Sequence, residues 1–319
     1  MEVCGRPIGR TLLFPAVLLL ASFWSAPTAA AGSVVELEIE GGIGVATADY
    51  VRSGIEHATE IGAELIIINI DTPGGLMKPM RGIVQDILAS PVPIAVYVTP
   101  AGARADSAGT YILLAAHIAA MAPTTHLGAA TPVPLIGGGG DDETESEEEP
   151  DSAPAMDRKM INDAVSYIRG LAERHGRNVE WAEDAVTEAA TLTATEALEN
   201  NVIDFVAVDR AALLAQLDGH EVVVNNEARS LSTTNAQIIA FEPDWRIRLL
   251  NVISNPEIVL LLGLIGLYGL MYEGWNPGAI VPGVVGAICL LLAAYALQVI
   301  PVNYAGLGLI LVGVALMVA

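Results

Sequence analysis

Three short pieces of this chain carry residue types that together can perform acyl transfer. Ser107 lies in the segment ADSAGT, the turn Gly74-Gly75 precedes it, and Lys159 follows it. A serine hydroxyl becomes nucleophilic when a nearby base takes its proton, and a neutral lysine amine can be that base. Backbone N–H groups of a glycine turn can approach a developing oxyanion closely because no Cβ intervenes. The three pieces therefore indicate a hydrolase, most simply a peptidase.

Apolar patterns predict the elements that must position these residues. Runs of β-branched residues predict strands, which we place at 34–39, 65–70, 94–98 and 201–208. Apolar residues at helical spacing predict helices, which we place at 47–62, 77–90, 108–120 and 157–175. This alternation predicts an α/β domain whose parallel sheet is covered by helices on both faces.

The candidate residues fall at the ends of these elements, where such a fold places its active groups. The Gly-Gly turn follows the predicted strand 65–70, and Ser107 precedes the predicted helix 108–120. The N–H of Ala108, at the start of that helix, could join the N–H of Gly75 around an oxyanion. Two ordinary readings stay open, because serine is a common helix N-cap and Pro-Gly-Gly also marks a plain turn.

Two lysines are available as the base, Lys78 and Lys159. Lys159 lies near the start of a predicted helix, where the helix dipole disfavours the ammonium form. Asp163, one turn further on, opposes that effect, and a solvated surface lysine is the alternative. Lys78 follows the Gly-Gly turn directly, so we expect it to face solvent or substrate.

Histidine is the rival base, because Ser-His-Asp sites are common. His117 would lie nearly three turns into the helix that Ser107 opens, about 15 Å away, which excludes direct proton transfer. His126 is closer to the expected site and stays open. Asp71 could orient a base or cap the turn.

Composition divides the chain into an exported domain and a membrane domain. The 319 residues have a mean hydropathy of +0.51 and a net charge of −22, too apolar for one soluble domain and too charged for a purely membrane-embedded chain. Residues 1–31 resemble a secretory signal peptide, with an uncleaved anchor as the alternative. We expect 32–245 to form the soluble domain. Residues 246–319 hold apolar runs at 258–272, 279–300 and 304–319, which predict about three transmembrane helices and a chain cut short within the last of them.

Charge and cysteine content exclude several functions. The negative net charge argues against nucleic-acid binding. Residues 32–256 contain no cysteine, so a disulfide, a cysteine nucleophile or a cysteine-ligated zinc site is excluded there. We expect no metal and no cofactor. The acidic, glycine-rich segment 135–154 lacks apolar periodicity and is expected to be a disordered loop, either a lid or a solvated insertion.

The motifs together resemble those of the NfeD-type membrane serine proteases. They are DTPGGL at 71–76, DSAGTYI at 106–112, AMAP at 120–123 and LGAATP at 127–132. This family belongs to the Clp protease and crotonase-like superfamily, as does signal peptide peptidase A. The resemblance implies repeated ββα units followed by transmembrane helices. It also implies that Ser107 is the nucleophile, Lys159 the base, and Gly75 and Ala108 the oxyanion donors.

The resemblance further implies a membrane-anchored serine endopeptidase that cleaves apolar stretches of membrane-associated proteins. Stomatin-like proteins are the expected substrates or partners, with membrane lipid around the anchor and a dimer or larger homo-oligomer. The base of the Clp branch, a histidine, would fall near Ala130 here, which favours lysine. The resemblance leaves open an inactive membrane scaffold and an acyl-CoA enzyme, although no basic cluster for the nucleotide supports the latter.

Overall fold

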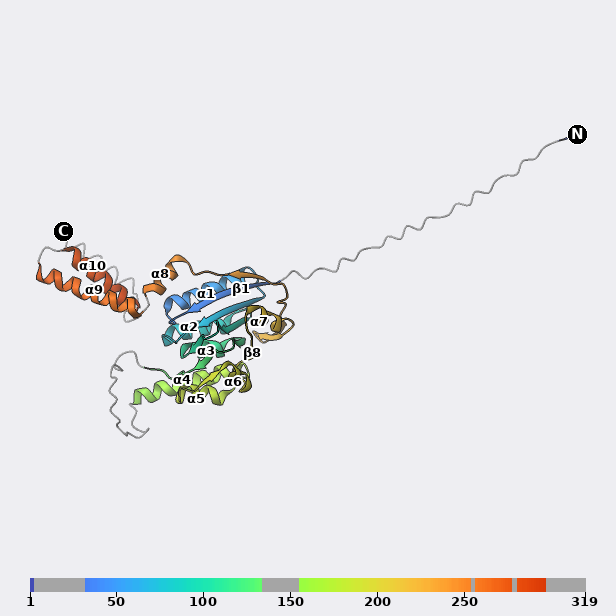
Figure 1. Ribbon diagram of the computed structural model, residues 1–319, viewed down its shortest axis with the longest axis horizontal. Coiled ribbons are helices and arrows are strands. Elements are labelled where there is room, and N and C mark those ends of the chain that lie inside the picture. Colours follow the sequence, from blue (N-terminus) through green and yellow to red (C-terminus); the bar gives the residue numbers. More distant parts are fainter. Residues whose placement is uncertain (3–31, 134–154, 254–255, 277–279, 297–319) are drawn as a thin grey trace. The chain divides into compact units, whose positions relative to one another are not determined.

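The computed structural model describes residues 1–2, 32–133, 155–253, 256–276 and 280–296. Its main element is a six-stranded sheet in which every neighbouring pair is parallel, shown in Figure 1. The strands, in spatial order, are β11 (Gln237–Ala240), β1 (Ser33–Glu40), β2 (Leu65–Asp71), β3 (Ile94–Val98), β5 (Ile118–Met121) and β8 (Phe205–Val206). The predicted α/β fold class is confirmed.

Strand periodicity divides the core between the two faces of the sheet. In β2, Ile66, Ile68 and Ile70 pack into one apolar cluster, whereas Leu65 and Ile67 pack into the other. All five side chains are fully buried, which explains why the strand reads as a continuous apolar run.

Helices cover both faces of this sheet (Figure 1). The first cluster is built with α1 (Val45–Glu60), α2 (Met77–Ala89), α3 (Ala108–Ala115), α4 (Ala155–Arg174), α5 (Val179–Thr187) and α6 (Ala194–Glu199). The second cluster is built with α7 (Arg210–Leu217) and β9 (Glu221–Val224). The strand β9 pairs with β10 (Glu227–Ser230).

A second, smaller layer of strand pairing carries the candidate site. It contains β4 (Arg104–Asp106), β6 (His126–Gly128) and β7 (Thr191–Thr193), with β4 parallel to β6. Isolated bridges Ile43↔Gly75 and Thr72↔Ala105 extend this pairing toward β1 and β2. Each long strand is thus followed by a short paired segment and then a helix, as β3, β4 and α3 illustrate. This is the repeated ββα arrangement that the resemblance implied.

Two predicted elements need correction. The predicted helix 108–120 is too long, because α3 ends at Ala115 and residues Ile118–Met121 form β5. The run is largely apolar, and periodicity cannot distinguish a buried helix from a buried strand. The predicted strand 201–208 is reduced to Phe205–Val206. The strands near 34–39, 65–70 and 94–98 and the helices near 47–62, 77–90 and 157–175 are present.

Arg177 fixes the end of the helix that begins after Ser107. Arg177 is 4% exposed, and its guanidinium donates hydrogen bonds to the carbonyls of Leu114 at 2.8 Å and Ala116 at 3.0 Å. It also donates to the Asp204 carboxylate at 2.8 Å. These carbonyls belong to the last turn of α3, which has no intrahelical donors for them. Arg177 therefore closes α3 and holds it beside β5.

We expect Arg177→Met to lower the free energy of unfolding by about 3–5 kcal/mol, because it removes the ion pair with Asp204 and leaves the buried helix-end carbonyls without the hydrogen bonds of the guanidinium. Arg169→Met is the matched control. The ion pair of Arg169 with Glu183 is about half exposed on both sides, so its loss should change stability by less than about 1 kcal/mol. Thermal unfolding of the two variants, followed by circular dichroism, measures the difference. Equal unfolding temperatures would contradict the assignment.

The C-terminal part contains α8 (Trp245–Ile253), α9 (Pro256–Trp275) and α10 (Ile280–Ala296). Among the described residues, Glu257–Trp275 is long and apolar enough to cross a bilayer, and α10 is a shorter apolar helix. The two backbones approach closely at glycines, since a Cβ on Gly269 would lie 2.5 Å from the Pro282 carbonyl oxygen and 3.0 Å from the Cα of Gly286. Contacts of this kind are typical of helix pairs in membranes.

Three predicted segments lie outside the described residues. They are the acidic loop 135–154, the last apolar run 304–319 and, beyond its first two residues, the signal segment 1–31.

Candidate functional site

Ser107 occupies the junction between β4 and α3 in a backbone conformation that is rare for a residue with a side chain. Its φ is +50° and its ψ is −113°. Such a conformation costs on the order of 1–3 kcal/mol and persists only where surrounding contacts impose it. Ser107 stands at the N-cap position of α3, but its side chain makes no capping hydrogen bond. The capping role that the sequence left open is therefore not what the hydroxyl does.

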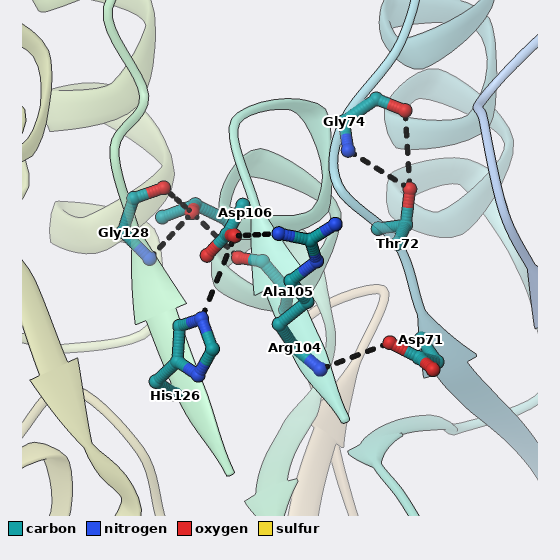
Figure 2. Close-up of polar contacts among 9 residues, drawn as sticks. Asp71, Thr72, Gly74, Arg104, Ala105, Asp106, His126 and Gly128 are labelled. Atoms are coloured by element: carbon teal, nitrogen blue, oxygen red, sulfur yellow. Dashed lines mark hydrogen bonds and ion pairs between the residues drawn. The ribbon is translucent and has the colours of Figure 1, made fainter. Parts of the chain in front are cut away.

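Hydrogen bonds hold the peptide groups on both sides of Ser107. Its N–H donates to the carbonyl of Gly128 at 2.9 Å, and its own carbonyl accepts the N–H of Thr110 at 3.0 Å. Gly128 ends β6, the partner of β4, and Figure 2 shows these two strands side by side at the site. The serine is thus presented at the end of β4, in the smaller sheet.

The Gly-Gly turn packs directly against Ser107. A Cβ on Gly74 would lie 2.7 Å from the Ser107 Cβ and 3.1 Å from its Oγ, and Gly74 has a φ of +120°. The Gly74 N–H donates to the Thr72 hydroxyl at 3.0 Å, which fixes the turn, as Figure 2 shows. A Cβ on Gly75 would lie 2.3 Å from the carbonyl oxygen of Ile43. Both positions therefore require glycine, and the turn is more than an ordinary chain reversal.

The two proposed oxyanion donors flank this contact. Ala108 is the first residue of α3, so its N–H has no acceptor within the helix. Gly75 follows Gly74 in the turn that leads into α2. The assignment of Gly75 and Ala108 as donors stays a prediction.

We expect Gly74→Ala to lower kcat/KM at least about 100-fold, because the new methyl group would displace the serine or the turn. Gly82→Ala is the matched control, since Gly82 lies inside α2 and a Cβ there meets nothing within 4 Å. Peptide turnover and circular dichroism of both variants separate a local defect from unfolding. Full turnover by a folded Gly74→Ala protein would refute the steric argument.

A charged cluster lies next to the nucleophile, on β4 and β6. The Asp106 carboxylate is 3.5 Å from both the His126 Nε2 and an Arg104 guanidinium nitrogen. Figure 2 shows His126 and Arg104 directed at this carboxylate. Burial raises the pKa of Asp106, and the His126 and Arg104 charges oppose that increase. His126, the rival base, is therefore engaged by Asp106, and among the described residues it makes no hydrogen bond to Ser107.

His117 is unsuited to be the base. It lies between α3 and β5, where its Nδ1 accepts the Ile94 N–H at 3.2 Å. Burial is the main cause that lowers the pKa of His117 to about 4. Asp71 was the candidate for orienting a base or capping the turn. Its carboxylate accepts the Arg104 N–H at 3.1 Å and so holds the loop before β4 (Figure 2).

Lys159 lies near the beginning of α4 and is exposed. The described contacts do not join it to Ser107, so its role as the base stays a prediction. Asp163, one turn further along α4, forms an ion pair with Arg81 of α2. In the sequence, Asp163 was expected to favour the charged form of Lys159. Its carboxylate is instead paired with Arg81.

An aromatic stack links the helix of Lys159 to the helix that follows Ser107. The rings of Tyr111 in α3 and Tyr167 in α4 are stacked with centroids 6.0 Å apart. The Arg81 guanidinium lies 4.3 Å from the centre of the Tyr167 ring. The Tyr111 hydroxyl donates to the carbonyl of Ala130 at 3.1 Å. Burial raises the pKa of Tyr111, so this phenol stays protonated and acts as a donor.

The described residues contain no group of three His, Cys, Asp or Glu side chains that could hold a metal ion.

Comparison with protein families matches both parts of the chain. Residues 33–227 match the N-terminal domain of NfeD1b, and residues 257–319 match the NfeD integral membrane domain. The membrane-bound protease PH1510 of Pyrococcus horikoshii is 36% identical over 312 residues, which cover 97% of this chain and 68% of that protein. The membrane protein NfeD1b of Bacillus subtilis is 28% identical over 261 residues, which cover 82% of this chain and 54% of that protein.

Solved structures agree with these matches. A lysine-to-alanine variant of 1510-N, a membrane-bound stomatin-specific protease, was determined with a substrate peptide. It has a TM-score of 0.61 and 37% identity, covering 70% of this chain and 98% of that one. A serine-to-alanine variant of the same protease has a TM-score of 0.59 and 37% identity, covering 67% and 100%.

Proposed function

The chain belongs to the NfeD family and is a membrane protein with a serine protease domain, and we propose that Ser107 and Lys159 form its catalytic dyad. The observation that carries the proposal is the geometry of Ser107. Its backbone is strained, and its side chain, which does not cap α3, lies directly against the Gly74-Gly75 turn. The solved serine and lysine variants of the stomatin-specific protease support the same pair of residue types.

The reaction would proceed through an acyl-enzyme. Lys159, as the neutral amine, accepts the Ser107 proton while Oγ attacks the scissile carbonyl carbon. The N–H groups of Gly75 and Ala108 stabilise the oxyanion of the tetrahedral intermediate. The protonated lysine then donates its proton to the leaving amine. A water molecule hydrolyses the ester with the same lysine as the base.

The proposed substrates are apolar segments of membrane-associated proteins, with stomatin-like proteins as candidates. The substrate-peptide complex of the stomatin-specific protease supports this choice. So does the apolar helix α9, which would place the protease domain near a bilayer.

We further propose that residues 1–31 direct export and that residues 32–245 act outside the cytoplasm. Residues 246–319 would then form a multi-pass anchor in contact with lipid, and the protein would work as a homo-oligomer. The predicted signal segment supports export of residues 32–245. The apolar runs 279–300 and 304–319 support the multi-pass anchor. The oligomer rests on the family resemblance.

Mass spectrometry of apolar peptides incubated with the detergent-solubilised protein tests the proposed function. Synthetic peptides with the sequences of membrane-flanking segments of stomatin-like proteins should be cut at defined bonds, and charged peptides of the same length should not. Hydrolysis of acyl-CoA thioesters without peptide cleavage would instead identify an acyl-CoA enzyme. Binding of the peptides without any cleavage would identify a scaffold.

A further inference from the structure

Thr110 is a polar residue in the first turn of the otherwise apolar helix α3. Its neighbours Ala108, Tyr111 and Ile112 are buried, and Thr110 itself is fully buried. A buried hydroxyl must be hydrogen-bonded, because leaving it unpaired is unfavourable. Its partners therefore show what the hydroxyl does.

The Thr110 hydroxyl joins three elements of the site. Its Oγ1 lies 2.9 Å from the carbonyl oxygen of Ala105 in β4 and 2.9 Å from that of Gly128 in β6. The same oxygen accepts the Gly128 N–H at 3.1 Å. Figure 2 shows Ala105 and Gly128, the residues of β4 and β6 whose carbonyls lie within hydrogen-bond distance of this hydroxyl. One side chain thus connects β4, β6 and α3 at the point where Ser107 sits.

Gly128 and Thr110 also bind the peptide groups of Ser107. Gly128 accepts the Ser107 N–H through its carbonyl, and the Thr110 N–H donates to the Ser107 carbonyl. The left-handed conformation of Ser107 is therefore held on both sides by groups that the Thr110 hydroxyl fixes relative to one another. A strained residue keeps its conformation only where its surroundings impose it in this way.

We infer that Thr110 is a positioning residue that keeps the Ser107 hydroxyl in its reactive orientation, an inference that rests on the proposed function of Ser107. Removing the hydroxyl leaves the Gly128 N–H and the Ala105 carbonyl without this partner. The backbone of Ser107 can then relax, and its Oγ moves away from its place beside Gly74. Misplacement of a reacting atom by about 1 Å can lower a rate 100-fold.

Three variants of the full chain in detergent test this role. Thr110→Val keeps the shape and removes the hydroxyl, and Thr110→Ser keeps the hydroxyl. Thr233→Val is the matched control, because Thr233 is also buried and donates to the Leu214 carbonyl at 2.6 Å, in a segment that contributes nothing to the site. The measurements are kcat and KM for one apolar peptide, the labelling rate of Ser107 by a fluorophosphonate, and the thermal unfolding temperature.

For Thr110→Val we expect kcat and the labelling rate to fall about 10-fold to 100-fold, with KM within about 2-fold of wild type. Thr110→Ser should restore kcat to within about 3-fold of wild type. Thr233→Val should unfold at a lower temperature but keep the wild-type kcat. A folded Thr110→Val protein with wild-type kcat, or a Thr110→Ser protein as slow as Thr110→Val, would overturn the inference.

Amide hydrogen exchange separates this inference from the proposed function. If the wild-type protein neither cleaves peptides nor reacts with the fluorophosphonate, the assignment of Ser107 fails. The exchange rate of the Ser107 and Gly128 amides still reports whether Thr110 holds them. Faster exchange in Thr110→Val, but not in Thr110→Ser, would support the positioning role, and unchanged exchange would overturn it.

Discussion

Ser107→Ala should abolish peptide cleavage, with a loss in kcat of about 10⁴-fold or more, while the protein stays folded. The hydroxyl is the proposed nucleophile, so no acyl-enzyme can form without it. Its removal should change the free energy of unfolding by less than about 1 kcal/mol, because the side chain caps nothing and the backbone bonds to Gly128 and Thr110 remain. Mass spectrometry of the peptides measures the cleavage, and circular dichroism measures the folded state.

Ser166→Ala is the matched control for that experiment. The Ser166 hydroxyl is exposed on α4 and donates to the Asn162 carbonyl of its own helix at 2.9 Å. The same chemical change there should leave turnover within about 2-fold of wild type. Turnover by a folded Ser107→Ala protein would move the nucleophile to another residue.

The main sheet was predictable because its central strands are apolar on both faces. The run at 65–70 is almost entirely isoleucine and leucine, and the glycine turn after it marks its end. The run from Ala108 to Met121 has the same apolar character but contains both a helix and a strand. No glycine or proline separates α3 from β5 there. Only the pairing of β5 with β3 and β8 distinguishes the two.

The parts of the candidate site that depend on neighbouring residues in the sequence were predictable. Gly74 and Gly75 lie in the turn that follows β2, and a glycine pair is itself a signal for close approach of the backbone. Thr110 and Gly128 lie within two of the quoted motifs, but the sequence assigns them no role, and it gives no signal for Arg177. The roles of all three depend on partners that the fold brings together. Arg177, for example, binds carbonyls of α3 more than sixty positions earlier. The signal available for Thr110 was a threonine in an otherwise apolar helix, three residues after the candidate nucleophile.

Lys159→Arg should be nearly inactive even though it keeps the positive charge, because a guanidinium stays protonated at any usable pH and cannot accept the Ser107 proton. Wild-type activity should rise with pH, since only the neutral amine acts as the base. Lys78→Arg, the same change at the other lysine, should stay within about 3-fold of wild type. The measurement is turnover of one apolar peptide by the folded variants from about pH 6 to about pH 10.

His126→Ala decides between the two possible bases in the same assay. His126 faces the Asp106 carboxylate, so its removal should perturb that cluster and leave most of the activity. The pH dependence should also keep its wild-type shape, because no proton transfer to the imidazole is proposed. Activity in Lys159→Arg together with loss in His126→Ala would replace the serine–lysine dyad with a serine–histidine mechanism. In that mechanism Asp106, already in contact with His126, would orient the imidazole.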